Sequence, residues 1–145
     1  MAIPLQIRSA AFQRASGCCE YCLSQACYSA TTFSIEHIKP ISQGGGTELN
    51  NLALACQGCN NFKYTATEAL DPLTGVRAAL YNPREDSWSD HFVWTADGTF
   101  MLGTSKVGRA TIERMKQNRE GVVNLRRTLA FVGKHPPIAP CRQAN

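Results

Sequence analysis

The chain lacks any run of apolar residues long enough to cross a membrane, which takes roughly 18 of them. Its opening residues, MAIPLQIRSAAFQR, are interrupted by Arg8 and Arg14 and do not form a signal peptide, so we expect them to belong to the folded protein. Internal repeats and low-complexity segments are also missing. A cytoplasmic globular protein is therefore expected. Its 145 residues fit one compact domain, or a small module with an extension.

A strong excess of one charge is missing as well, because the net charge is only +4. The charge is unevenly distributed, however. Residues 1–70 are balanced, whereas residues 101–134 carry a local excess of Lys and Arg against only Glu113 and Glu120. A basic segment fits a polyanionic partner such as nucleic acid, but it also occurs on soluble proteins as a solvated face. Charge alone favours neither interpretation.

Hydrophobic patterning predicts a mixed α+β fold. Helices are expected at about 6–16, 108–118 and 120–132, and another is opened by a turn within 59–70. Strands are expected within 30–41 and 52–56, antiparallel to each other, and on both sides of a tight turn at 96–98. The change of character near residue 70 predicts a module at 1–70, an extension at 71–134 packed on it, and a flexible tail at 135–145.

Seven cysteines are a large number for a chain without a secretion signal, where disulfides are disfavoured. Two C-x2-C pairs stand out, Cys19 with Cys22 and Cys56 with Cys59. Such a spacing lets a tight turn direct both sulfurs at one metal ion, and two such turns form the tetrahedral four-thiolate site that Zn²⁺ favours. A redox protein needs only one such pair. We therefore predict a structural zinc ion with no open position for catalysis.

The remaining cysteines are less informative. Cys18 could replace Cys19 as a ligand at a C-x3-C spacing, whereas Cys27 and Cys141 are interpreted as plain thiols. A closed zinc site also argues against a hydrolase that acts on small substrates through zinc.

Between the cysteine pairs the sequence runs through IEHIKP, a triple-glycine loop and an Asn-Leu step, and it ends in CQGCNNFK. This order of motifs over residues 18–64 resembles the HNH endonuclease family. The resemblance implies a ββα-metal (His-Me finger) fold, in which two antiparallel strands and a helix hold a metal ion, and a hydrolase that cleaves DNA phosphodiester bonds. The third named position is Asn here, as in the HNN variants of the family.

By this resemblance His37 is the general base that activates water, and Asn51 ties the loop to the strand and orients the histidine. Asn50 is an alternative to Asn51. The resemblance also implies that Glu36, where the family usually has Asp, and Asn60 share a catalytic Mg²⁺ or Mn²⁺. The chemistry is consistent, because neutral imidazole can take a proton from water and oxygen ligands suit hard cations.

One geometric difficulty follows from strand structure. Adjacent residues of a strand point to opposite faces, so Glu36 and His37 serve one site only if the backbone twists or bulges. The alternative for His37 is a buried side chain that is hydrogen-bonded to a carbonyl. The alternative for the whole chain is a non-catalytic zinc module that binds nucleic acid or protein.

Seven basic residues are candidates for sequence-independent contacts with DNA phosphates. Along the last helices, Ile112, Met115, Val122, Leu125 and Leu129 are expected to face inward. Trp88, Phe92 and Trp94 are interpreted as core residues. The phosphate-contact candidates are Lys39, Lys63, Arg109, Lys116, Arg119, Arg126 and Arg127.

Overall fold

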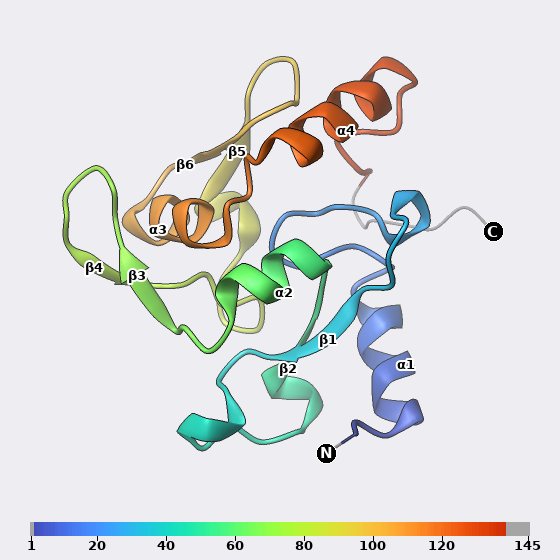
Figure 1. Cartoon of the computed structure of the whole chain (residues 1–145), viewed down its shortest axis with the longest axis vertical. Coiled ribbons are helices and arrows are strands. Elements are labelled where there is room, and N and C mark those ends of the chain that lie inside the picture. The colour runs from blue at the N-terminus through green and yellow to red at the C-terminus, as the bar shows by residue number, and fades with distance from the viewer. Residues whose placement is uncertain (1, 139–145) are drawn as a thin grey trace.

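The structure is a computed structural model in which residues 2–138 are described. This part of the chain is a mixed α+β fold with short two-stranded antiparallel sheets and helices packed around them (Figure 1). None of the described helices has the length and apolar character needed to span a membrane. The elements in chain order are α1 (Leu5–Arg14), β1 (Ser34–His37), β2 (Leu52–Ala55), α2 (Gln57–Lys63), β3 (Glu68–Leu70), β4 (Arg77–Ala79), β5 (Phe92–Trp94), β6 (Met101–Gly103), α3 (Lys106–Met115) and α4 (Glu120–Phe131).

The N-terminal elements follow the sequence-based expectations closely. Helix α1 starts after Pro4, whose missing amide proton costs nothing at a helix start, and the chain turns at Gly17 with φ 74. Strands β1 and β2 pair antiparallel, with Glu36 opposite Ala53 and His37 opposite Leu52. All four residues of β2 are buried, so this strand forms the centre of the hairpin's packing, and α2 follows it directly.

The outer edge of β2 is closed by groups from other elements. The carbonyl oxygen of Leu52 accepts hydrogen bonds from Arg14 (2.6 Å) and Arg84 (3.2 Å). The backbone amide of Leu54 donates to the carboxylate of Glu20 (2.9 Å), and the carbonyl of Leu54 accepts from the amide of Glu20 (2.9 Å). Arg84 and Glu20 also form an ion pair. The Leu52 and Leu54 backbone groups on the side of β2 away from β1 therefore have hydrogen-bond partners in other elements.

The helix predicted within 59–70 is shorter than expected. Helix α2 ends at Lys63, because Tyr64 adopts φ 51 and ψ −119, which no helix can continue. Residues 68–70 are a strand instead, β3, which pairs with β4 and carries an ion pair between Glu68 and Arg77 (2.7 Å). The hairpin predicted around 96–98 is confirmed as β5 and β6.

The two predicted C-terminal helices and the break between them are confirmed, and so is the inward position of Met115 on α3. The inward face of α4 differs in part from the one expected, since Val122 and Leu129 are only partly buried. Leu125 is 37% exposed, whereas Val123 and Arg126 are buried. Burial of the Arg126 guanidinium is possible because it donates to the carbonyls of Gln117 (2.6 Å) and Thr99 (3.1 Å). The Cζ atom of the Arg126 guanidinium also lies 5.0 Å from the centre of the Trp94 ring.

One apolar cluster contains residues from both sides of the boundary predicted near residue 70. Cys59 of α2 and Met115 of α3 both belong to it, and both have no exposed surface. Phe92 lies in the same cluster beneath Trp88, with ring centres 5.1 Å apart, in agreement with the core interpretation of these aromatic residues. The domain division itself stays a prediction.

The described beginning of the predicted tail is attached to the fold. His135 is buried, its Nε2 lies 2.8 Å from the carbonyl oxygen of Gly98, and its ring meets that of Trp94 edge-on. Residues 139–145, which include Cys141, lie outside the described residues.

Candidate metal centre and nuclease site

The two C-x2-C pairs meet in one buried cluster. The sulfur atoms of Cys19, Cys22, Cys56 and Cys59 all lie within 4.8 Å of one another. The first pair occupies a turn before β1 and the second opens α2, where the Cys56 sulfur accepts from the Cys59 amide (3.4 Å). In the first pair the Cys22 amide donates to the Cys19 sulfur (3.5 Å).

This arrangement fits a zinc ion. Zinc–sulfur bonds of about 2.3 Å in a tetrahedron place neighbouring sulfurs roughly 3.8 Å apart, and the Cys22 and Cys56 sulfurs are 3.7 Å apart. Burial raises the pKa of the Cys19 thiol, a cost that a bound cation removes. Cys19 rather than Cys18 belongs to the cluster, and Cys27 is exposed elsewhere. The four-cysteine prediction is therefore supported by the geometry.

A residue that the sequence did not reveal contacts this cluster from the C-terminal part of the chain. The side-chain amide of Gln117, which has no exposed surface, donates to the Cys59 sulfur (3.5 Å) and approaches the Met115 sulfur (3.7 Å). The side-chain carbonyl oxygen of Gln117, Oε1, has no hydrogen-bond partner among the described atoms. No motif marks Gln117, because its role depends on the packing of the α3–α4 turn against α2.

His37 lies at the end of β1 with a partly exposed side chain. Its Nε2 is 3.0 Å from the hydroxyl of Thr47, which lies in the loop between β1 and β2. The structure therefore gives His37 a side-chain partner rather than the buried carbonyl contact of the alternative interpretation. Thr47 was missed in the sequence, where a threonine after three glycines carries no distinct signal.

The Asn51 side chain holds the loop that carries Thr47 against the residues just after β1. The Asn51 side chain accepts from the Lys39 amide (2.9 Å) and donates to the carbonyls of Lys39 (3.0 Å) and Gly46 (2.8 Å). A side chain at Gly45 would meet the Lys39 carbonyl at 1.8 Å, so the loop can close this tightly only with glycine there. Asn51 thus has contacts of the kind that the family resemblance implies for the middle asparagine.

Glu36 points away from His37 and into the protein. Its carboxylate accepts a hydrogen bond from the Tyr21 hydroxyl and pairs with the Lys63 ammonium at 3.2 Å. Burial raises the pKa of Glu36, while the charge of Lys63 opposes that rise. Lys63 also donates to the carbonyl of Ile38 (3.0 Å). Both carboxylate oxygens are therefore engaged, and Glu36 and His37 do not share a face of the strand.

Asn60 lies one turn before Lys63 on α2 and is partly exposed, with its backbone amide bonded to the Cys56 carbonyl (2.9 Å). Within residues 2–138 its side chain has no hydrogen bond to another residue. An amide oxygen at this position is free to bind a cation or a phosphate-bound water. The structure places it on the helix that packs against β1.

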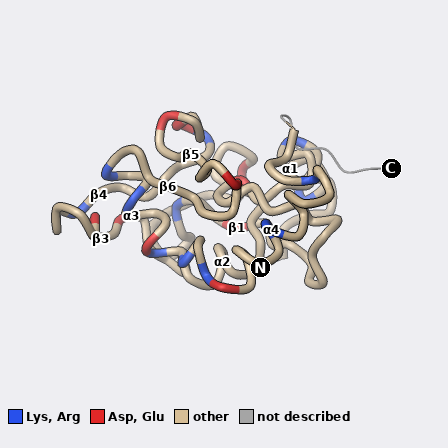
Figure 2. Tube along the Cα trace, turned by 90° about the horizontal axis from the view of Figure 1, so that it is seen from above, with Lys and Arg blue, Asp and Glu red and all other residues tan. Residues whose placement is uncertain are grey.

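The candidate phosphate contacts divide into two groups. Lys63 and Arg126 are buried, and Arg109 forms a two-point ion pair with the carboxylate of Asp71 (2.8 and 2.9 Å), so all three have intramolecular roles. The others are at least partly exposed. They are Lys39, Lys116, Arg119 and Arg127. Figure 2 shows Lys and Arg distributed over many elements, so charge alone does not mark one binding face.

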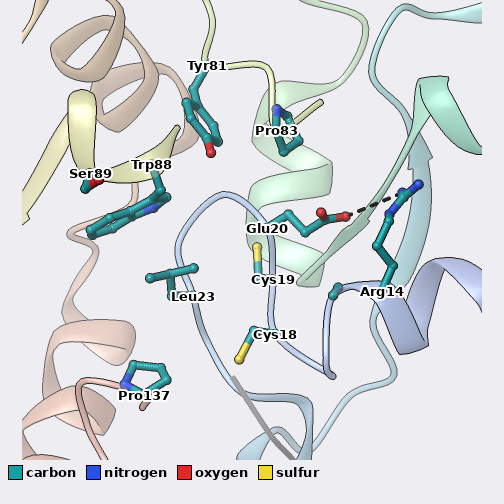
Figure 3. Close-up of a pocket in the computed structure, with 11 residues that line it drawn as sticks. Arg14, Cys18, Cys19, Glu20, Leu23, Tyr81, Pro83, Trp88, Ser89 and Pro137 are labelled. Carbon is teal, nitrogen blue, oxygen red and sulfur yellow. Dashed lines mark ion pairs between the residues drawn. The ribbon is translucent and has the colours of Figure 1, made fainter. Parts of the chain in front are cut away.

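A separate cavity of about 410 Å³ lies beside the first cysteine pair, between α1 and the segment that follows β4 (Figure 3). Arg14 and Glu20, 3.9 Å apart, line it on one side, and Trp88 lies on the other. None of its lining residues is a predicted catalytic residue. The cavity is therefore distinct from the surface around His37.

Together these residues form a hairpin-and-helix segment that carries a four-cysteine cluster and presents a histidine beside a fixed loop. Residues 19–65 match the family model described as HNH endonuclease. The matched segment contains both cysteine pairs, β1, β2 and α2, so the resemblance inferred from the sequence is confirmed for this part of the chain, which is less than half of it. Neither the curated proteins nor the solved structures gave a match.

Proposed function

We propose that this protein is a zinc-stabilised endonuclease of the HNH type that hydrolyses DNA phosphodiester bonds. The observation that carries the proposal is the match of residues 19–65 to the family, combined with a partly exposed His37 beside a loop that Asn51 holds in place. Hydrolysis of a phosphodiester requires a base that activates water and a site that stabilises the charge on the phosphate.

His37 is the proposed general base. Thr47 holds one ring nitrogen at 3.0 Å and thereby restricts the orientation of the imidazole, while Asn51 restrains the loop to which Thr47 belongs. A base that is already oriented loses less entropy when it takes a proton from an attacking water. Thr47 and Asn51 are thus positioning residues for His37.

A divalent ion such as Mg²⁺ or Mn²⁺ is the proposed catalytic cofactor, because a bound cation stabilises the phosphate and the leaving oxygen. Asn60 is an accessible oxygen ligand for it. Glu36 is a less accessible second ligand, since its carboxylate is buried and both of its oxygens already contact Tyr21 and Lys63. We therefore assign no catalytic step to Glu36.

The test is cleavage of supercoiled plasmid by zinc-loaded protein, with Mg²⁺, with Mn²⁺ and with no added divalent ion. We expect nicked or linear product only with an added ion, and none from His37→Ala, in which zinc content and thermal unfolding are unchanged. Full cleavage by His37→Ala would rule out this mechanism. His37→Asn serves as a second variant of similar volume.

The engaged carboxylate of Glu36 favours one alternative, a non-catalytic zinc module that binds nucleic acid. If the protein is such a module, His37→Ala should bind DNA as tightly as the parent. Neither protein should release product with any divalent ion. The same plasmid assay, read together with a binding measurement, separates the two functions.

A further inference from the structure

Tyr64 is held in a backbone conformation that its side chain does not favour. It ends α2 with φ 51 and ψ −119. Glycine adopts this region of backbone conformation without steric cost, whereas a bulky residue there is an outlier. Such conformations cost folding free energy and persist where a site needs the residue. We therefore expect Tyr64 to have a role that offsets the folding free energy lost to this strain.

Packing does not supply that role. The Tyr64 side chain is 76% exposed, and within residues 2–138 it makes no hydrogen bond and no ring contact. Only its backbone is used, since its amide donates to the Asn60 carbonyl (3.1 Å). The protein thus bears the strain of an aromatic residue whose ring points into solvent.

The position of Tyr64 connects it to the proposed nuclease site. The next residue, Thr65, accepts a hydrogen bond through its carbonyl from the Gln43 side chain (2.9 Å), and Gln43 lies in the loop that Asn51 fastens. On the other side, the carbonyl of Lys63 accepts from the guanidinium of Arg114 (3.3 Å). Tyr64 therefore lies between the loop beside His37 and a cation of α3.

Phe62, two residues before Tyr64 in the chain, is a second exposed aromatic residue, and two further cations lie beside it. Phe62 is 38% exposed, and the charged groups of Lys116 and Arg119 each lie 6.0 Å from the centre of its ring. A side chain at Gly58 would meet the Arg119 guanidinium at 2.0 Å, so glycine at this position lets Arg119 lie against α2. Exposed aromatic rings together with nearby cations are typical of surfaces that bind single nucleic-acid strands.

We propose that the surface made by Phe62, Tyr64, Lys116 and Arg119 binds an unpaired nucleic-acid strand next to the cleavage site. The ring of Tyr64 stacks on a base, and Lys116 and Arg119 contact backbone phosphates. This inference rests on the proposed function for the identity of the substrate, but it concerns binding rather than hydrolysis. It further predicts a preference for DNA with unpaired bases.

The strain provides a test in which stability and binding move in opposite directions. In Tyr64→Gly, glycine adopts this backbone conformation without strain. The free energy recovered outweighs the cost of the added conformational freedom of the unfolded chain, so the thermal midpoint stays level or rises. Loss of one stacked base weakens binding about ten-fold. Binding is measured in the His37→Ala background, by anisotropy of a labelled single-stranded oligonucleotide and of the matching duplex.

We expect Tyr64→Phe to bind like the parent, and Tyr64→Gly to lose more affinity for the single strand than for the duplex. Replacing Lys116 and Arg119 with Gln should lower the salt dependence of single-strand binding by roughly 0.7 for each phosphate that is no longer neutralised. The matched control is Phe131→Ala, since Phe131 is 92% exposed at the end of α4, far from the end of α2 in Figure 1.

A lower thermal midpoint for Tyr64→Gly, unchanged single-strand binding, or an equal loss for the duplex would each overturn the proposal. The result does not depend on the cleavage assay. If His37→Ala cleaved as well as the parent, the proposed mechanism would fail, while the binding data would still decide the role of Tyr64.

Discussion

The carboxylate of Glu36 and the ammonium of Lys63 lie 3.2 Å apart, and their side chains are only 5% and 2% exposed. This is a buried ion pair between strand β1 and helix α2 of the proposed nuclease site. Its geometry decides whether Glu36 is a support for the fold or a ligand for a divalent ion.

Lys63→Met should destabilise the protein by about 3–5 kcal/mol, because it leaves an uncompensated carboxylate in the interior. The double variant Glu36→Gln with Lys63→Met should recover most of that loss, since no buried charge remains. Chemical denaturation of the parent, of Lys63→Met and Glu36→Gln separately, and of the double variant measures the coupling. Additive losses in the double variant would contradict the ion-pair account.

Mn²⁺ should raise the thermal midpoint of Lys63→Met more than that of the parent if Glu36 can bind a divalent ion. The ammonium no longer competes for the carboxylate in that variant, so ion binding becomes favourable. Glu36→Gln should show no such shift. An identical response in all three proteins would leave Glu36 with a structural role only.

Replacing Cys22 with Ser should abolish zinc binding and cooperative thermal unfolding, because a four-thiolate ion contributes its binding free energy to folding. Zinc released on thiol modification and a calorimetric scan measure the two effects. Cys27→Ser is the matched control, since Cys27 is exposed and outside the cluster, and both quantities should stay unchanged. Full zinc content in Cys22→Ser would contradict the assignment.

Gln117→Leu should lower zinc affinity about ten-fold, because outer hydrogen bonds to a ligand stabilise its charge and orientation. The fold should tolerate the change, since leucine fills a similar volume and removes the unpaired carbonyl oxygen. A competition titration with a chelating dye gives the affinity. Gln13→Leu, an exposed position on α1, is the comparison, and equal affinities in both variants would show that the Cys59 contact is without effect.

Stability should depend on the pair of Asp71 and Arg109 at acid pH. Hydrogen bonds from the Arg109 guanidinium hold the pKa of Asp71 well below its usual value. A carboxyl group with a depressed pKa stabilises the fold above its unfolded pKa of about 4, and this contribution is lost as the pH falls further. The difference in thermal midpoint between the parent and Asp71→Asn should therefore be constant above about pH 5 and shrink below pH 4.

The sequence predicted those features of the site that depend on local spacing. Both cysteine pairs have a fixed two-residue interval, so their convergence needs only that two turns meet. The strands around residues 34–37 and 52–55 follow from β-branched and apolar runs, and the Gly17 turn follows from the need for positive φ. Each of these signals lies within a few residues.

The features that the sequence missed depend on contacts between distant segments. Helical periodicity placed Arg126 outside, because a pattern cannot show that carbonyls 9 and 27 residues away accept hydrogen bonds from a buried guanidinium. Strand β3 was missed because three residues form it only by pairing with β4. Gln117 and the Glu36 contact with Lys63 are of the same kind.

The closed edge of β2 has a consequence for how the molecule meets other chains. A two-stranded hairpin normally offers a free row of backbone donors and acceptors to any extended peptide. Here Arg14, Arg84 and Glu20 already occupy that row at Leu52 and Leu54. The hairpin therefore cannot grow by adding a foreign strand at this edge, and whatever this protein recognises there must be recognised through side chains and loops.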